Sequence, residues 1–429
     1  MENIALDRAR AAYARVEERY ISALQEKGLA FDEPCAHEEE RRRLLEQLRE
    51  RGVTFRNAGA SLSWGHLSPA CVECTGVDGS ETFSTTFRCH RDCYFCFNRN
   101  QADYERFFRE GCPWEEGLAR SASENESLAC IGLTGGEPLL DVDASIRFLE
   151  AAKERFPEAH LRMYTSGDLL TEDAARRLRD AGLDEIRFSV KDDDPAPLQD
   201  AVVAGMRLAK RYIPSVMVEM PVIPGAEAHM KGLLRTFDEV GVDGINMLEF
   251  CFPFCNWEEF ERRGFLLKRP PFEVMYDYGY SGGLAISGSE ELILELMVWA
   301  IDEGLGLGLH YCSLENKHRS EIRQKNERAR GLHPCLEMDE GTFFLQCGKA
   351  FGQDVPVVRD ALSALGCADA IEDAQEESVA FPLAYMDEVA HMAHERGCAP
   401  QLQVAYHVYE VEDDGAYFID VAIRDRVRA

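Results

Sequence analysis

Patterns typical of strands and helices alternate six times between residues 81 and 250 of this 429-residue chain. Helical spacing of apolar residues fills the intervals between runs that are rich in apolar and β-branched residues. Such alternation predicts a parallel sheet with its helices outside, and six units are too few for a closed eight-stranded barrel. The predicted strands cover residues 81–87, 129–134, 160–164, 185–190, 215–222 and 244–250, and the predicted helices cover residues 101–110, 141–155, 171–181, 197–211 and 229–240.

Two motifs follow the first two predicted strands, at the edge where parallel sheets collect their functional groups. Cys89, Cys93 and Cys96 have the spacing C-x3-C-x2-C, and residues 135–138 read GGEP. Thiolates are soft ligands that suit iron–sulfur clusters, zinc and copper. Because an iron–sulfur cube usually takes four cysteines, three in one loop leave one metal position open, as a catalytic metal requires. For the cysteine loop taken alone, the alternatives are a zinc site and a chance spacing.

Together these motifs resemble the radical S-adenosylmethionine (radical SAM) superfamily. The resemblance implies an α/β fold, an open (β/α)6 partial barrel, and a [4Fe–4S] cluster held by Cys89, Cys93 and Cys96. The fourth iron is then expected to bind S-adenosylmethionine (SAM), which one electron splits into methionine and a 5′-deoxyadenosyl radical. That radical is expected to abstract hydrogen from an unidentified substrate. The residues that the resemblance places around SAM are Gly135, Gly136, Glu137, Phe95, Ser166, Ser189 and Ile223.

The resemblance also implies what each of these residues does. The two glycines let backbone groups approach the SAM ammonium, whose charge Glu137 balances. Phe95 and Ile223 are expected near the adenine, Ser166 near the ribose, and Ser189 near the methionine carboxylate. Ordinary loop chemistry is the alternative for the two serines and the isoleucine.

A closer resemblance covers about residues 68–330. It rests on NMLEF at residues 246–250, GSEE at 288–291, and HYCS at 310–313 followed by Lys317. These stretches are similar to an uncharacterised radical SAM group related to pyruvate formate-lyase activating enzyme. That group brings no known substrate.

Five further cysteines suggest a second metal site. Cys71 and Cys74 have the C-x2-C spacing of zinc and cluster ligands, and Cys312 ends a predicted strand. With Cys335 or Cys347 as the fourth ligand, they predict a tetrahedral zinc or iron site, or an auxiliary cluster. The alternative is that several of them are ordinary buried thiols.

The chain outside the alternating region predicts two smaller parts. Amphipathic helices over residues 2–26 and 38–51 form an N-terminal helical segment, residues 1–67, expected to pack outside the barrel of residues 68–312. Two hairpins, one flanked by Cys335 and Cys347 and one turning at Asp-Asp-Gly, predict a C-terminal α+β domain over residues 313–429.

An aromatic segment between Cys251 and Gly288 is predicted to be a water-excluding lid over an apolar substrate pocket. Tyr94 and Phe97 of the cysteine loop are predicted to pack in the core. The aromatic residues of the lid are Phe252, Phe254, Trp257, Phe272, Tyr276, Tyr278 and Tyr280. Polar residues expected to face the pocket, or else to form a buried hydrogen-bond network, are Asn246, Glu249, His310, Tyr311 and Lys317.

Composition narrows the partners and the location. The 47 basic and 77 acidic residues give a net charge of −30, which repels the phosphates of nucleic acid. No apolar run is long enough to span a membrane, and 15 cysteines predict reduced thiols in a cytoplasmic protein. We therefore expect a small-molecule or peptide substrate and an electron donor such as flavodoxin or ferredoxin. The alternative functions are a non-catalytic metal-binding scaffold and a cobalamin-dependent radical SAM methylase.

Overall fold

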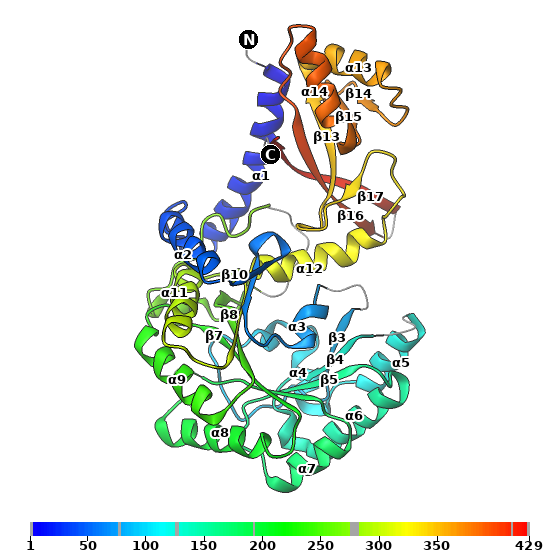
Figure 1. The fold of residues 1–429 in the computed structure, drawn as a ribbon. Coiled ribbons are helices and arrows are strands. Elements are labelled where there is room, and N and C mark those ends of the chain that lie inside the picture. Colours follow the sequence, from blue (N-terminus) through cyan, green and yellow to red (C-terminus); the bar gives the residue numbers. More distant parts are fainter. Residues whose placement is uncertain are drawn as a thin grey trace. The chain divides into compact units, whose positions relative to one another are not determined.

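The structure, a computed structural model, describes residues 3–75, 79–124, 128–191, 194–274, 283–412 and 415–426. Its contacts divide the chain into two compact units (Figure 1). The barrel unit contains residues 30–269 and 280–316, and the terminal unit contains residues 1–29, 270–279 and 317–429. Within the described ranges, no helix has the length and apolar character needed to cross a membrane.

A nine-stranded sheet with the order β1-β2-β11-β8-β7-β6-β5-β4-β3 forms the barrel unit. Six of its strands, β3 to β8, are the predicted ones, and they lie side by side in chain order and run parallel. The sheet runs from β1 to β3 without closing on itself in the described part of the chain, which confirms the partial barrel. The strands are β1 (Thr54–Arg56), β2 (Ser61–Trp64), β3 (Ser80–Ser84), β4 (Cys130–Thr134), β5 (His160–Thr165), β6 (Glu185–Phe188), β7 (Ser215–Val222), β8 (Gly244–Glu249) and β11 (Gly308–Cys312).

Helices cover one face of this sheet, as the outer layer of α6 to α9 shows in Figure 1. Apolar side chains of these helices, such as Leu149 and Leu234, pack against strand residues such as Ile186 and Phe188. Because side chains alternate along a strand, residues between these apolar ones point to the opposite face, which we call the inner face. The helices of the unit are α2 (Glu38–Glu50), α3 (Pro69–Glu73), α4 (Tyr104–Glu110), α5 (Trp114–Glu124), α6 (Val142–Arg155), α7 (Glu172–Asp180), α8 (Ala196–Ala209), α9 (Glu227–Val240), α10 (Trp257–Arg262) and α11 (Ser289–Asp302).

Three strands extend the sheet beyond the six predicted units. β11 pairs with β8 in parallel, β2 pairs with β11 in antiparallel fashion, and β1 pairs with β2. Residues 61–73 therefore contain strand β2 and helix α3. Short polar strands such as SLSW carry little periodic signal, and their pairing with β11 makes them strands. A short pair, β9 (Cys251–Phe252) and β10 (Leu284–Ala285), lies outside the main sheet.

The terminal unit contains a six-stranded antiparallel sheet with the order β14-β15-β13-β16-β17, to which β12 adds beside β13. Ala350 of β13 packs with α13 and α14, whereas its neighbour Phe351 packs with Ala5 and Leu6 of α1. Helices therefore cover both faces of this sheet. The elements are α1 (Ile4–Glu26), α12 (Leu314–Glu327), β12 (Glu337–Met338), β13 (Leu345–Phe351), α13 (Val355–Ala364), β14 (Ile371–Asp373), β15 (Ser378–Phe381), α14 (Met386–Glu395), β16 (Gln403–Glu412) and β17 (Gly415–Asp425).

The two units divide the chain at other places than the predicted boundaries after residues 67 and 312. The first helix, α1, packs in the terminal unit, whereas α2 and strands β1 and β2 belong to the barrel unit. The expectation that both N-terminal helices pack outside the barrel therefore fails for α1. Its buried side chains match the apolar surface of β13 and β17, a long-range contact that helical spacing alone does not reveal.

Candidate functional site at the carboxyl edge of the sheet

The cysteine loop follows the carboxyl end of β3, as predicted. Cys89, Cys93 and Cys96 are all half-buried, and the backbone N–H of Arg91 donates to Cys89 Sγ at 3.4 Å. Burial raises the pKa of the Cys89 thiol, while this N–H and the charge of Lys191 act against the rise.

The GGEP turn after β4 holds the cysteine loop by its backbone. Gly136 N–H donates to Thr86 O at 2.8 Å, and Glu137 N–H donates to Arg88 O at 2.7 Å. A Cβ at Gly135 would lie 2.3 Å from Thr86 O, and one at Gly136 would lie 1.9 Å from Arg88 O. Only glycine permits this approach at both positions, and Gly135 also has a φ of +116°, which favours glycine.

The Glu137 carboxylate is buried, and protein groups lie within hydrogen-bond distance of both of its oxygens. One oxygen accepts from Leu139 N–H at 3.0 Å and from the Thr165 hydroxyl at 2.6 Å. The other lies 2.8 Å from Ser166 N–H and 2.6 Å from the Ser166 hydroxyl. Since a carboxylate offers about four acceptor positions, these contacts surround it with protein groups and join the carboxyl ends of β4 and β5.

The other predicted SAM residues also lie at strand ends or on the cysteine loop. The Ser189 hydroxyl after β6 accepts from Lys191 Nζ at 2.6 Å, and Ile223 after β7 is buried. The Phe95 ring contacts the rings of Tyr94 and Phe250, with centroids 5.0 and 5.7 Å apart. Ser166, Ser189 and Ile223 thus end three consecutive parallel strands of one sheet.

Aromatic residues after β8 pack onto the cysteine loop. Phe260 contacts Tyr94 with ring centroids 5.3 Å apart, and the Asn256 side chain donates to Tyr94 O at 3.0 Å. Tyr94 is buried as predicted, whereas Phe97 is 51% exposed, so its predicted core position is wrong. The loop turns outward at Phe97 as a short 3-10 helix begins there. Tyr276, Tyr278 and Tyr280 of the predicted lid lie outside the described residues.

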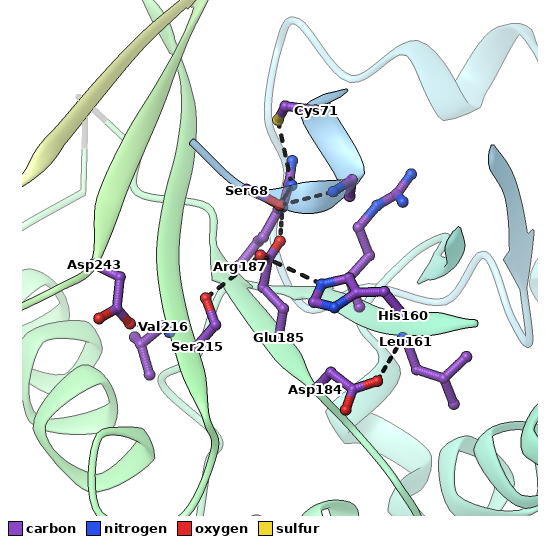
Figure 2. Close-up of polar contacts among 12 residues, drawn as sticks. Ser68, Cys71, His160, Leu161, Asp184, Glu185, Arg187, Ser215, Val216 and Asp243 are labelled. Atoms are coloured by element: carbon purple, nitrogen blue, oxygen red, sulfur yellow. Dashed lines mark hydrogen bonds and ion pairs between the residues drawn. The ribbon is translucent and has the colours of Figure 1, made fainter. Parts of the chain in front are cut away.

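A polar network occupies the inner face of the barrel unit below this edge. Figure 2 shows Arg187 of β6 between Glu185 and the turn that carries Ser68 and Cys71. Arg187 Nε donates to Glu185 at 2.6 Å, and its Nη2 lies 2.8 Å from Ser68 Oγ and 3.4 Å from Cys71 Sγ. A third nitrogen of the guanidinium pairs with Glu219 of β7. This arginine is therefore satisfied by the protein itself.

The predicted pocket residues divide between two places in the barrel unit. Asn246 and His310 are register partners on β8 and β11, and Asn246 donates to Glu219 at 2.9 Å while His310 lies 2.9 Å from Ser61 Oγ. Asn246 Oδ1 and His310 Nδ1 are buried and have no hydrogen-bond partner in the described part of the chain. Glu249 instead accepts from Leu314 N–H at 2.8 Å, and Tyr311 is buried.

The cysteines of the predicted second metal site have other surroundings. Cys71 contacts Arg187, and Cys312 Sγ accepts from the Asn316 side chain at 3.5 Å. Cys74 is exposed. Cys335 and Cys347 lie in an apolar cluster of the terminal unit, where burial raises the pKa of each thiol, to about 11 and about 12.

No group of three His, Cys, Asp or Glu side chains is arranged to hold a metal among the residues that the structure describes. The predicted second site therefore has no assembled ligand set there. For the cysteine loop, the fit to a cluster rests on donor chemistry: three half-buried thiols in one loop and an N–H donor to sulfur. Binding would require these thiols to turn toward one another.

Comparison with known proteins identifies one domain of the chain. Residues 83–237, from β3 to α9, match the family model described as the radical SAM superfamily. The chain contains a radical SAM domain. This match confirms the resemblance found in the two motifs, and the radical SAM domain includes the cysteine loop, the GGEP turn and the ends of β5 to β7.

Relatives of this chain match it over part of its length. A Methanocaldococcus jannaschii protein with the provisional name glycyl-radical enzyme activating enzyme is 29% identical over 60% of this chain and 66% of its own. The GTP 3′,8-cyclase of Campylobacter curvus is 30% identical over 39% of this chain and 50% of its own. The chain thus spans about half to two thirds of these relatives. Streptococcus suis SuiB, solved with its precursor peptide SuiA, aligns with a TM-score of 0.39 and 12% identity over 62% of this chain and 52% of its own.

Proposed function

We propose that this chain is a radical SAM enzyme that binds a [4Fe–4S] cluster through Cys89, Cys93 and Cys96 and binds SAM beside it. The observation that carries the proposal is the docking of the cysteine loop on the GGEP turn by two backbone hydrogen bonds. When bound, a reduced cluster supplies the electron for cleavage of SAM. The task of the chain is then to hold the loop, orient SAM and exclude water.

The contacts within the site refine the proposed role of Glu137. Because groups of Leu139, Thr165 and Ser166 surround its carboxylate, we assign its effect on the SAM ammonium to charge and to the backbone that it fixes. Gly135 and Gly136 leave the backbone of the turn uncovered by side chains. Phe95, Ser166, Ser189 and Ile223 remain the proposed contacts for the rest of SAM.

For the substrate, the name of the M. jannaschii relative favours a peptide or protein over a small molecule. The net charge of −30 favours a basic partner surface. An electron donor such as flavodoxin or ferredoxin completes the proposed partners. Deuterated candidate substrates test this part, because hydrogen abstraction transfers label into 5′-deoxyadenosine.

The cluster assignment is tested by anaerobic reconstitution. The wild-type protein should bind iron and sulfide and form 5′-deoxyadenosine from SAM under dithionite. Replacing Cys89, Cys93 and Cys96 with Ala should abolish both the iron absorbance and the product, whereas Cys398→Ala, at an exposed cysteine, should change neither. Product formation by the triple variant would contradict the proposal.

A further inference from the structure

Asp168 connects the cysteine loop with the GGEP turn. It follows β5, and its side chain is only 8% exposed. Asp168 Oδ2 lies 2.9 Å from His90 Nε2, and Oδ1 lies 3.2 Å from Arg91 Nη2. His90 and Arg91 are the residues directly after Cys89. The first proposed cluster ligand is therefore followed by two side chains that end on one carboxylate.

Arg91 extends this connection to the next strand. Its side chain is 7% exposed, and Nη1 lies 2.8 Å from Oδ1 of Asp194, whose side chain is 9% exposed. Asp194 follows β6, so one guanidinium of the cysteine loop is held by carboxylates from two adjacent strand ends. Removing one partner of such a buried ion pair destabilises the protein, because the other charge remains unpaired in a site of low dielectric.

Ser166 carries the connection on to Glu137. Its hydroxyl lies 2.7 Å from Asp168 Oδ1 and 2.6 Å from Glu137 Oε2. The hydroxyl has one proton and two carboxylate neighbours, so the position of each carboxylate affects the hydrogen bond made to the other. An uninterrupted chain of polar contacts thus runs from Arg91 through Asp168 and Ser166 to Glu137.

We propose that Asp168 is a positioning residue that holds the cysteine loop and the SAM-binding turn in one fixed relation. The inference rests on the proposed function and extends it to a residue outside both motifs. Asp168 acts through its contacts with Arg91, His90 and Ser166. Its loss should disturb the placement of SAM against the cluster more than the binding of iron.

The test compares Asp168→Ala and Asp168→Asn with wild type in the reconstituted protein. Asp168→Ala should retain iron and raise the dissociation constant for SAM at least tenfold in calorimetry. It should also reduce the change that SAM causes in the electron paramagnetic resonance spectrum of the reduced cluster. Asp168→Asn keeps an acceptor for the Ser166 hydroxyl and should therefore bind SAM more tightly than Asp168→Ala does. Asp173→Asn, in an exposed ion pair with Arg176, serves as the matched control and should change neither readout.

A double-mutant cycle keeps the inference testable if Asp168→Ala does not fold. If this series of polar contacts acts as a unit, Ser166→Ala and Asp168→Asn should weaken SAM binding non-additively. The double variant should then bind SAM about as weakly as the single variant with the lower affinity. Additive effects, or wild-type affinity and spectrum in the Asp168 variants, would overturn the role of Asp168. If the wild-type protein binds the cluster and SAM, such a result contradicts only the role of Asp168 and leaves the proposed function standing. If the wild-type protein binds neither, the proposed function and the role of Asp168 are both overturned.

Discussion

Gly136 has the tightest constraint of the two glycines in the GGEP turn. An added Cβ would lie 1.9 Å from the Arg88 carbonyl oxygen, and backbone atoms of the cysteine loop cannot move away as a flexible side chain can. The hydrogen bonds from Gly136 and Glu137 to residues 86 and 88 depend on this approach. Both glycines thus set the separation of the cysteine loop and the turn, and Gly136 leaves the least room.

Gly136→Ala should displace the cysteine loop, weaken SAM binding and lower thermal stability. Gly232→Ala is the matched control, because a Cβ at this exposed position in α9 meets no atom within 4 Å. In a helix, this control should raise stability by roughly 0.5–1 kcal/mol. Calorimetric SAM binding and thermal unfolding measure both effects, and equal behaviour of the two variants would contradict the close contact.

Arg187 gives a second prediction at the scale of one residue. Arg187→Met would leave Glu185 and Glu219 in the interior without their cation, and such a loss is expected to lower stability by about 3–5 kcal/mol. Arg176→Met, in an exposed pair with Asp173, should change stability by no more than about 0.5 kcal/mol. Urea unfolding of both variants compares them, and a small effect at Arg187 would show that water replaces the guanidinium.

Among the secondary-structure elements, α2, α11 and β8 are joined by ion pairs at two buried glutamates. Arg41 Nε of α2 lies 2.8 Å from Glu290 in the first turn of α11, and Lys268 Nζ lies 2.6 Å from the other Glu290 oxygen. Lys268 also lies 3.5 Å from Glu249 at the end of β8. Burial alone would raise the pKa of Glu290, but Lys268 and Arg41 outweigh it and lower this pKa from 4.5 to about 2.

This network predicts a dependence of stability on pH. A carboxyl whose pKa is lowered by folding stabilises the protein fully above pH 4.5, and its contribution is lost as the pH falls from 4.5 toward 2. Urea unfolding of the cluster-free protein should show this loss, and Glu290→Gln should be less stable at neutral pH and less pH-dependent in that window. Glu46→Gln, at an exposed carboxylate, should retain the wild-type slope. An identical slope for Glu290→Gln would contradict the network.

At the scale of the whole molecule, helix α1 belongs to the same compact unit as the last strands of the chain. Leu6 is fully buried and packs near Phe351, and Asn3 donates to Phe351 O at 3.0 Å. Arg10 pairs with Asp425 at 2.5 Å. The terminal unit is therefore assembled from the two ends of the sequence, with the barrel unit inserted between them.

Leu6→Ala should destabilise the terminal unit and leave the barrel unit intact. A large-to-small change at a buried leucine costs about 2–5 kcal/mol, whereas Val16→Ala, at a residue 40% exposed, should have little effect. Hydrogen exchange resolves the two units, and faster exchange is expected in β13 and β17 but not in β4 to β8. Faster exchange in both units alike would contradict this assignment.

The sequence determined the six βα units and the place of both motifs at strand ends. Apolar periodicity is a local property of the chain, and strands as regular as residues 215–222 show it without knowledge of the fold. The cysteine spacing and the GGEP turn are also local, so the family could be inferred from them. Their shared edge follows because parallel strands end on the same side of a sheet.

Only the tertiary structure decided which distant residues meet. Residues 61–64 form strand β2 because they pair with β11, almost 250 residues away. Helix α1 packs against Phe351 and Ile423, near the other end of the chain. Arg91 meets Asp168 and Asp194, and Cys71 meets Arg187, because the barrel brings these loops together. Buried ion pairs depend on register and topology, which leave no periodic pattern in the sequence, so the contact between Cys71 and Arg187 could not be predicted from it.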